Sequence, residues 1–230
     1  MVLIIKNKES AAAKSKRATE IARMLTKMYE RRKTMLDWSN SWECLVAIQL
    51  SAQCTDKRVN IVTPALFKHY PSVRHYAEAP IEELEELVHS TGFYRNKAKN
   101  IQAAARMVIE EFGGEVPRTM DELLKVPGVA RKTANVLLFN AFDIVEGVAV
   151  DTHVLRITKL LGLISREAGA GVKGKGDPVK VERELMELLP RKYYGLFALL
   201  ITEHGRAVCI ARRPKCVECK FNQMCPGSEV

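Results

Sequence analysis

The sequence lacks a hydrophobic segment long enough to cross a membrane. No apolar run approaches the roughly 20 residues that a transmembrane helix requires. Residues 1–5 are apolar but too few for the core of a signal peptide. We therefore predict an intracellular protein with no membrane partner, in the cytoplasm or nucleoid if the source is prokaryotic. A reducing compartment of this kind would keep the six cysteines available as thiols.

The alternation of polar and apolar residues that is typical of β-strands is almost absent, and only residues 144–150 come near it. Helical periodicity is present instead. Apolar side chains recur at steps of three and four within residues 16–32, and residues 42–51 are apolar almost all round. Further helices are predicted over residues 81–88 and 96–112. The predicted fold class is all-α.

Acidic residues are too few to balance the basic ones. The chain has 36 Lys and Arg against 27 Asp and Glu, which gives a net charge of +9 and a pI near 9.3. Such an excess suggests a polyanionic partner, most simply nucleic acid. A basic protein without such a partner is equally compatible with the charge alone.

Four of the six cysteines are crowded into 17 residues near the C-terminus, in the pattern C-x6-C-x2-C-x5-C. They are Cys209, Cys216, Cys219 and Cys225. The spacing is too tight for two comfortable disulfides and suits one metal centre. Four thiolates are what a 4Fe–4S cluster requires, and a tetrahedral zinc site with four thiolates is the alternative. Zinc ribbons usually pair two C-x2-C knuckles, whereas only one is present, so the spacing favours the cluster without excluding zinc.

A helical hairpin is predicted in the middle of the chain. Thr119 and Glu122 match a capping box, which predicts a short helix, and a second helix is expected near Arg131, after a turn over residues 126–130. Such a hairpin leaves backbone N–H groups unpaired at a helix N-terminus, where they can hold one phosphate of DNA without reading bases. The residues expected to form this cradle are Gly128, Val129, Ala130 and Arg131, followed by Lys132. An ordinary corner between two helices is the alternative.

Residues 168–178 are rich in glycine and lysine and include a partial match to a nucleotide-binding loop. Gly169 is followed after four residues by Gly174 and Lys175, but Gly176 stands where a Ser or Thr is required. A helix, not a strand, is also expected before this segment. We predict a surface loop with no nucleotide site.

The hairpin, the cysteine spacing and further segments occur together in one known family. The matching segments are LSAQCTD (residues 50–56), TGFYRNKAKNI (91–101), VPGVARKTANVLL (126–138), VDTHVLR (150–156) and HGRAVCIARRPKC (204–216). In these segments the chain resembles the endonuclease III family, within the helix–hairpin–helix DNA glycosylases. Two differences stand out: Ala130 replaces the usual second glycine of the hairpin, and the 168–178 loop is longer than is common.

The resemblance implies a two-domain helix–hairpin–helix glycosylase fold. Residues 36–145 would form a six-helix barrel that contains the hairpin. An N-terminal helix within residues 1–35 would join residues 146–230 to form a domain holding a 4Fe–4S cluster on the four cysteines. Double-stranded DNA with damaged bases or abasic sites would lie across the groove between the domains, and the protein would act as a monomer.

The resemblance also implies a reaction. Lys132 would be the nucleophile and Asp151 its carboxylate partner in a bifunctional DNA glycosylase and AP lyase. Such an enzyme excises oxidised pyrimidines in base-excision repair and cleaves 3′ to the abasic site by β-elimination through a Schiff base. The helix N-terminus and Arg131 both disfavour the protonated form of the Lys132 amine. The alternatives are a phosphate-binding role for Lys132 and a plain N-cap role for Asp151.

Two groups of DNA contacts complete this prediction. By their positions in the matching segments, Gln53 and Phe93 resemble the family residues that fill the gap left by an extruded base. A loop glutamine and a half-buried phenylalanine are the alternatives. Arg212, Arg213 and Lys215 lie on the short loop between two cysteines and form either a phosphate clamp or a merely solvated basic loop.

Two other functions remain compatible with these residues. One is an iron–sulfur protein that binds DNA without catalysis. The other is a monofunctional mismatch glycosylase, although such relatives usually lack a lysine at the position of Lys132.

Overall fold

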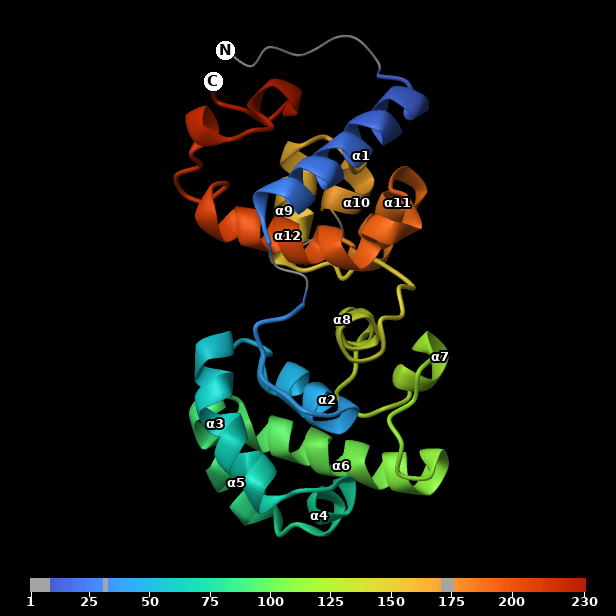
Figure 1. The fold of residues 1–230 in the computed structure, drawn as a ribbon, viewed down its shortest axis with the longest axis vertical. Helices are drawn as coiled ribbons and strands as arrows, with labels where there is room; N and C mark the ends of the chain where they lie inside the picture. Colours follow the sequence, from blue (N-terminus) through green and yellow to red (C-terminus); the bar gives the residue numbers. More distant parts are fainter. Residues whose placement is uncertain (1–8, 31–32, 171–175) are drawn as a thin grey trace. The chain divides into compact units, whose positions relative to one another are not determined.

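The computed structural model describes residues 9–30, 33–170 and 176–230 (Figure 1). The described part of the chain forms helices and contains no β-strand, so the all-α prediction is confirmed. None of its helices is long and apolar enough to cross a membrane. The chain divides into two compact units, each with its own hydrophobic core.

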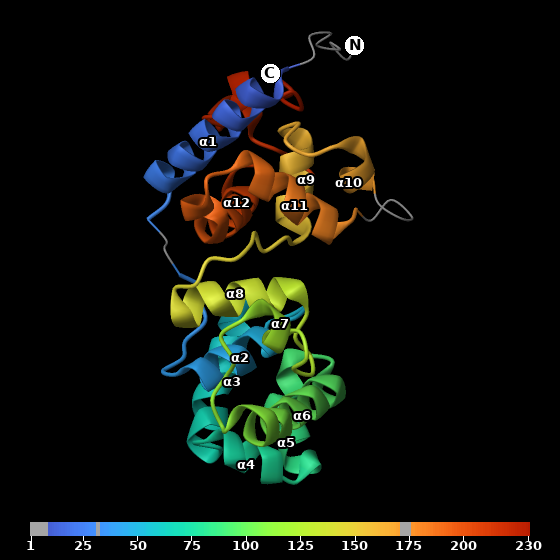
Figure 2. The ribbon, with the colours of Figure 1, turned by 90° about the vertical axis from the view of Figure 1, so that its right-hand side faces the viewer.

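The first unit combines the two ends of the chain, from the described residues of Met1–Lys33 and Val145–Val230. Its elements are α1 (Ala11–Met28), α9 (Thr152–Leu160), α10 (Arg166–Ala170), α11 (Pro178–Leu188), η3 (Arg191–Tyr193), α12 (Tyr194–Ala207), η4 (Cys216–Glu218) and η5 (Asn222–Met224). Helix α1 packs on α11 and α12, as Figures 1 and 2 both show. The Arg17 guanidinium on α1 donates to the Leu161 and Met224 carbonyls at 2.6 and 3.2 Å. The N-terminal helix is thereby tied to the C-terminal segment.

The second unit, Thr34–Ile144, is continuous in sequence. Its elements are α2 (Ser41–Leu50), α3 (Asp56–His69), α4 (Val73–Glu78), α5 (Ile81–Val88), η1 (His89–Thr91), α6 (Tyr94–Phe112), α7 (Met120–Leu123) and α8 (Arg131–Phe142). Helix α2 is central, since it packs against α3, α6 and α8 and buries nearly every residue (Figure 2). This burial explains why its sequence is apolar all round and not amphipathic.

Two helices begin earlier in the sequence than predicted. Helix α1 begins five residues before the predicted start because Ser10 accepts a hydrogen bond from the Ala13 N–H. Helix α6 begins at Tyr94, two residues before the predicted start, and ends at Phe112 as predicted, where the C-cap Gly113 has the left-handed φ of 64°. The predicted 168–178 loop is shorter than expected, because its first three residues belong to α10 and Asp177 caps α11. Its centre, residues 171–175, lies outside the described residues.

Candidate functional site

The predicted hairpin is present in the second unit as α7, a tight turn and α8. The Thr119 hydroxyl accepts from the Glu122 N–H at 3.4 Å and donates to the Glu122 carboxylate at 2.6 Å, which starts α7. The turn closes through the Val129 N–H, which donates to the Val126 carbonyl at 3.1 Å. The capping-box prediction is therefore confirmed by the local hydrogen bonds.

Gly128 is required at this turn for two reasons. Its φ of +76° lies in the region that residues with a side chain rarely adopt. A Cβ there would also lie 3.0 Å from Asn100 Cβ and 3.0 Å from Gln49 Nε2. Gln49 Nε2 donates to the Pro127 carbonyl at 2.8 Å. The turn thus packs directly against side chains of α2 and α6.

The N-terminus of α8 has no side-chain cap. Ala130 is the N-cap residue, with φ −94° and ψ 167°, so its methyl group is accepted without backbone strain. Val129 is buried, and Lys132 is exposed in the first turn beside the half-buried Arg131. An uncapped helix start next to two cations is suited to an anion such as a phosphate.

Gln53 and Phe93 are brought together although they are far apart in sequence. Both are exposed, Phe93 to 63%, and both have left-handed backbone angles, with φ of 53° and 49°. They line one cavity of about 210 Å³, whose other lining residues are Gln49, Ala52, Asn96, Lys97, Asn100 and Gly128. Non-glycine residues held in this conformation store strain, which is common at functional sites. The two loop tips and the hairpin turn therefore border the same space.

Asp151, in the first unit, is the N-cap of α9. Its Oδ1 accepts from the N–H groups of His153 and Val154, both at 2.8 Å. Its Oδ2 accepts from the Thr202 hydroxyl at 3.1 Å and lies 3.8 Å from His153 Nδ1. The carboxylate is a quarter exposed. The N-cap role is therefore real, and it engages only one of the two carboxylate oxygens.

Thr202 reaches Asp151 because α12 lies very close to α9. A Cβ on Gly205 would approach His153 Cδ2 and Ile157 Cδ1 to 2.8 Å, so a larger residue at this crossing would require these side chains to move. Thr202 was not predicted from the sequence as a partner of Asp151. Residues 51 positions apart in sequence offer no spacing signal for such a contact.

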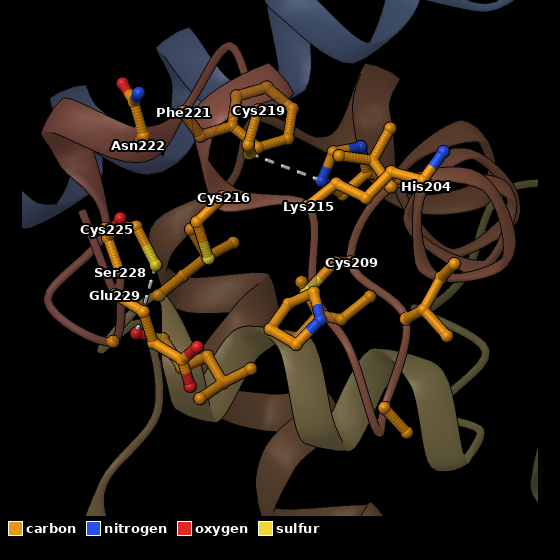
Figure 3. Close-up of a pocket in the computed structure, with 18 of the residues that line it drawn as sticks. His204, Cys209, Lys215, Cys216, Cys219, Phe221, Asn222, Cys225, Ser228 and Glu229 are labelled. Carbon is orange, nitrogen blue, oxygen red and sulfur yellow. Dashed lines mark hydrogen bonds between the residues drawn. The ribbon is translucent and has the colours of Figure 1, made fainter.

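The four cysteines of the C-terminal pattern line one cavity of about 540 Å³ in the first unit (Figure 3). All four are free thiols and half-buried. Within the part of the chain that the structure describes, no group of three His, Cys, Asp or Glu side chains is arranged to hold a single metal ion. Burial raises the pKa of the Cys219 and Cys225 thiols, and charge on the neighbouring thiols acts in the same direction.

Polar side chains contact two of these sulfurs. Arg156 Nη1 lies 3.6 Å from Cys209 Sγ, and its Nη2 donates to the Cys209 carbonyl at 2.7 Å. His204 Nε2 lies 3.6 Å from Cys219 Sγ, as Figure 3 shows, and its Nδ1 lies 3.0 Å from the Tyr29 hydroxyl. Burial and, to a smaller extent, Arg156 lower the pKa of His204 to about 4. Such contacts fix the orientation of the cysteine side chains.

The loop between Cys209 and Cys216 presents its basic residues to solvent. Arg212, Arg213 and Lys215 are all exposed. The Lys215 N–H donates to the Val208 carbonyl at 2.9 Å, which closes the base of the loop. Lys215 Nζ also lies 3.8 Å from the Glu218 carboxylate. The two arginines are therefore the stronger candidates for phosphate binding.

The hairpin and the two strained loop tips of the second unit, taken with the cysteine cavity of the first, are typical of helix–hairpin–helix DNA repair proteins. The profile of the HhH-GPD superfamily base excision DNA repair proteins matches residues 46–191. The chain belongs to this superfamily.

Individual relatives agree with this assignment. Endonuclease III of Synechocystis sp. is 52% identical over 218 residues, which cover 95% of each chain. Endonuclease III of Bacillus subtilis is 46% identical over 187 residues, 81% of each chain. Two solved structures, a non-covalent Endonuclease III–DNA complex and a trapped covalent Endonuclease III–DNA intermediate, each match with a TM-score of 0.84 and 39% identity. Each match covers 93% of this chain and 96% of the other.

Proposed function

We propose that this chain is a bifunctional DNA glycosylase and AP lyase of base-excision repair. It excises oxidised pyrimidines from duplex DNA and cleaves the strand 3′ to the abasic site. The observation that carries this proposal is the 52% identity with an Endonuclease III over 95% of both chains. The likeness to a trapped covalent Endonuclease III–DNA intermediate supports a mechanism that passes through a covalent bond to DNA.

Lys132 is the proposed nucleophile. Its amine is exposed in the first turn of α8, at a helix N-terminus that has no side-chain cap. The nitrogen forms a bond to C1′ of the extruded nucleotide as the bond from C1′ to the base breaks. The nitrogen then loses a proton and forms a C=N bond to C1′ as the C1′–O4′ bond breaks and O4′ takes up a proton, which gives the Schiff base of the opened sugar. Loss of the 2′ proton from this Schiff base expels the 3′ phosphate. Water finally hydrolyses the Schiff base and frees the amine.

Asp151 is the proposed carboxylate partner in the same reaction. Its Oδ1 is committed to the N-cap of α9, whereas Oδ2 holds only the Thr202 hydroxyl and the more distant His153 ring. A negative oxygen held in this way stabilises positive charge that develops on the sugar and can accept or return a proton. Capping and catalysis then use different oxygens of one side chain.

The remaining predicted residues are proposed to bind DNA. Backbone N–H groups of the hairpin hold a phosphate, and Gln53 and Phe93 fill the gap that the extruded base leaves. Arg212 and Arg213 hold the backbone at a second position. We assign the first unit as the cluster domain and the second as the six-helix barrel. The protein is proposed to act as a monomer on the DNA inside the cell.

The four cysteines are proposed to hold a 4Fe–4S cluster, whose role here is to order the loop that carries the two arginines. A single zinc ion needs its sulfurs about 2.3 Å from one point, so they must be close together. A 4Fe–4S core also takes four thiolate ligands, and the four thiols line one cavity of about 540 Å³. Arg156 and His204 would donate hydrogen bonds to the sulfurs of Cys209 and Cys219.

The purified protein is expected to contain about four iron atoms and four sulfide ions per chain and to be straw-brown. Cys219→Ser should lose the visible absorption and most of the iron, because one of the four ligands is gone. Cys44→Ser is the matched control, since this buried cysteine lies in the other unit and should retain the colour. A colourless protein with one zinc per chain would contradict the cluster.

The activity is tested with duplexes that carry one oxidised pyrimidine. We expect release of that base together with strand cleavage 3′ to the site, and no cleavage of the undamaged duplex. Release of the base without cleavage would favour a monofunctional glycosylase. Tight binding with neither product would favour a DNA-binding protein without catalysis.

A further inference from the structure

Lys97 is a buried cation in the second unit that no proposed catalytic step uses. Its side chain belongs to α6 and is only 6% exposed. Burial lowers the pKa of its amine, because the charged form is taken out of water. No carboxylate forms an ion pair with it among the described residues. Burying a charged amine costs free energy, and hydrogen bonds to the amine must offset that cost.

The amine donates these hydrogen bonds to carbonyl groups at the ends of two helices. Lys97 Nζ donates to the carbonyl of Leu50, the last residue of α2, at 2.8 Å. It also donates to the carbonyl of Thr91, the last residue of η1, at 2.8 Å. Carbonyls at helix C-termini lack partners within the helix and carry partial negative charge, so they are well suited to an ammonium group. A single amine therefore joins two segments that are 41 residues apart in sequence.

Each of these helix ends leads directly into one of the strained loop tips. Gln53 follows Leu50 by three residues, and Phe93 follows Thr91 by two. Both tips have left-handed backbone angles, and Lys97 itself lines the cavity that they border. The backbone of Lys97 adds a further link, because its N–H donates to the Phe93 carbonyl at 3.1 Å. The position of each tip thus depends on the same residue.

We propose that Lys97 is a positioning residue that holds Gln53 and Phe93 at a fixed separation, so that both enter the DNA duplex together. The inference rests on the proposed function, in which these two side chains replace an extruded base. Unstacking a base costs free energy that the inserted groups must offset, and groups already in place do so without further loss of conformational freedom. Lys97 does not touch the reacting sugar in this arrangement, so it acts through the two tips.

The test is a double-mutant cycle between Lys97→Met and Phe93→Ala. Methionine preserves the length and apolar stem of lysine but cannot donate to either carbonyl. Rates of excision are compared on one lesion in duplex and in single-stranded DNA. Each single variant is expected to lose about tenfold or more on the duplex and much less on the single strand. On the duplex, the double variant should excise the lesion only slightly more slowly than the less active single variant, because both changes remove the same insertion step.

Lys68→Met is the matched control, since this exposed lysine lies in the last turn of α3 and its replacement should leave both rates unchanged. Circular dichroism and cluster absorption report whether each variant is folded. If Lys97→Met does not fold, the cycle is repeated with Lys97→Arg, whose planar guanidinium cannot reproduce both bonds of the amine. Multiplicative losses, or equal losses on both substrates, would overturn the proposal. Wild-type protein inactive on both substrates would instead refute the proposed function.

Discussion

Lys132→Ala is expected to abolish the covalent adduct that borohydride traps between the wild-type protein and abasic-site DNA. The adduct forms only when an amine has displaced the sugar oxygen and the resulting Schiff base is reduced. Lys132 is an exposed amine in the first turn of α8, at a helix end that has no side-chain cap. Strand cleavage should fall by about a thousandfold or more, since the covalent route is lost.

Two further variants separate catalysis from phosphate binding at this position. Lys132→Arg keeps the positive charge and the capacity to bind a phosphate, but a guanidinium is not a nucleophile at neutral pH. It should therefore bind abasic-site DNA nearly as well as the wild type and form no adduct. Lys125→Ala removes an exposed lysine from the same hairpin and should still be trapped. A trapped adduct of Lys132→Arg, or unchanged trapping of Lys132→Ala, would show that another amine is the nucleophile.

Asp151→Asn is expected to reduce the excision rate by about a hundredfold or more. Asparagine is as good an N-cap as aspartate, so its side-chain oxygen can continue to accept from the N–H groups of His153 and Val154. The change removes only the negative charge, which the proposed mechanism uses to stabilise the sugar. The midpoint of thermal unfolding should therefore shift little while the single-turnover rate falls.

Asp177→Asn provides the matched control for this change. Asp177 caps α11 by accepting from the N–H groups of Val179 and Lys180, in the same manner as Asp151 caps α9. Its replacement should leave both stability and excision close to the wild-type values. If Asp151→Asn were equally harmless, capping would be the whole role of Asp151, and the carboxylate would have no part in the reaction.

Much of the helical pattern could be predicted because its signals are local. The capping box at Thr119, the glycine after Phe112 and the apolar run of α2 each act within a few residues, and the structure bears out each of them. Boundary errors arose where a cap outside the periodic segment extended the helix, as Ser10 does for α1. The cysteine pattern was also visible, since the spacing of four cysteines within 17 residues is itself a local signal.

The supporting residues of the candidate site could not be predicted in the same way. In the sequence, Lys97 is one of several polar residues of a predicted helix. Gln49 is an isolated polar residue in an apolar run. Their roles became visible only when the packing of α2 against α6 and of the hairpin on both was known. Arg156 likewise falls in a segment of family resemblance, but its contact with Cys209 depends on the fold of the first unit.

The amino-acid sequence alone determined the helical class, the hairpin and the four-thiol pattern. These depend on the order and spacing of residues that are near one another in the chain. Only the tertiary structure showed that Gln53 and Phe93 border one cavity with Gly128, and that the Thr202 hydroxyl donates to the Asp151 oxygen that takes no part in the cap. Such contacts are decided by which helix faces pack together and how closely. That packing arises from side chains distributed over the whole unit, and no short sequence pattern records it.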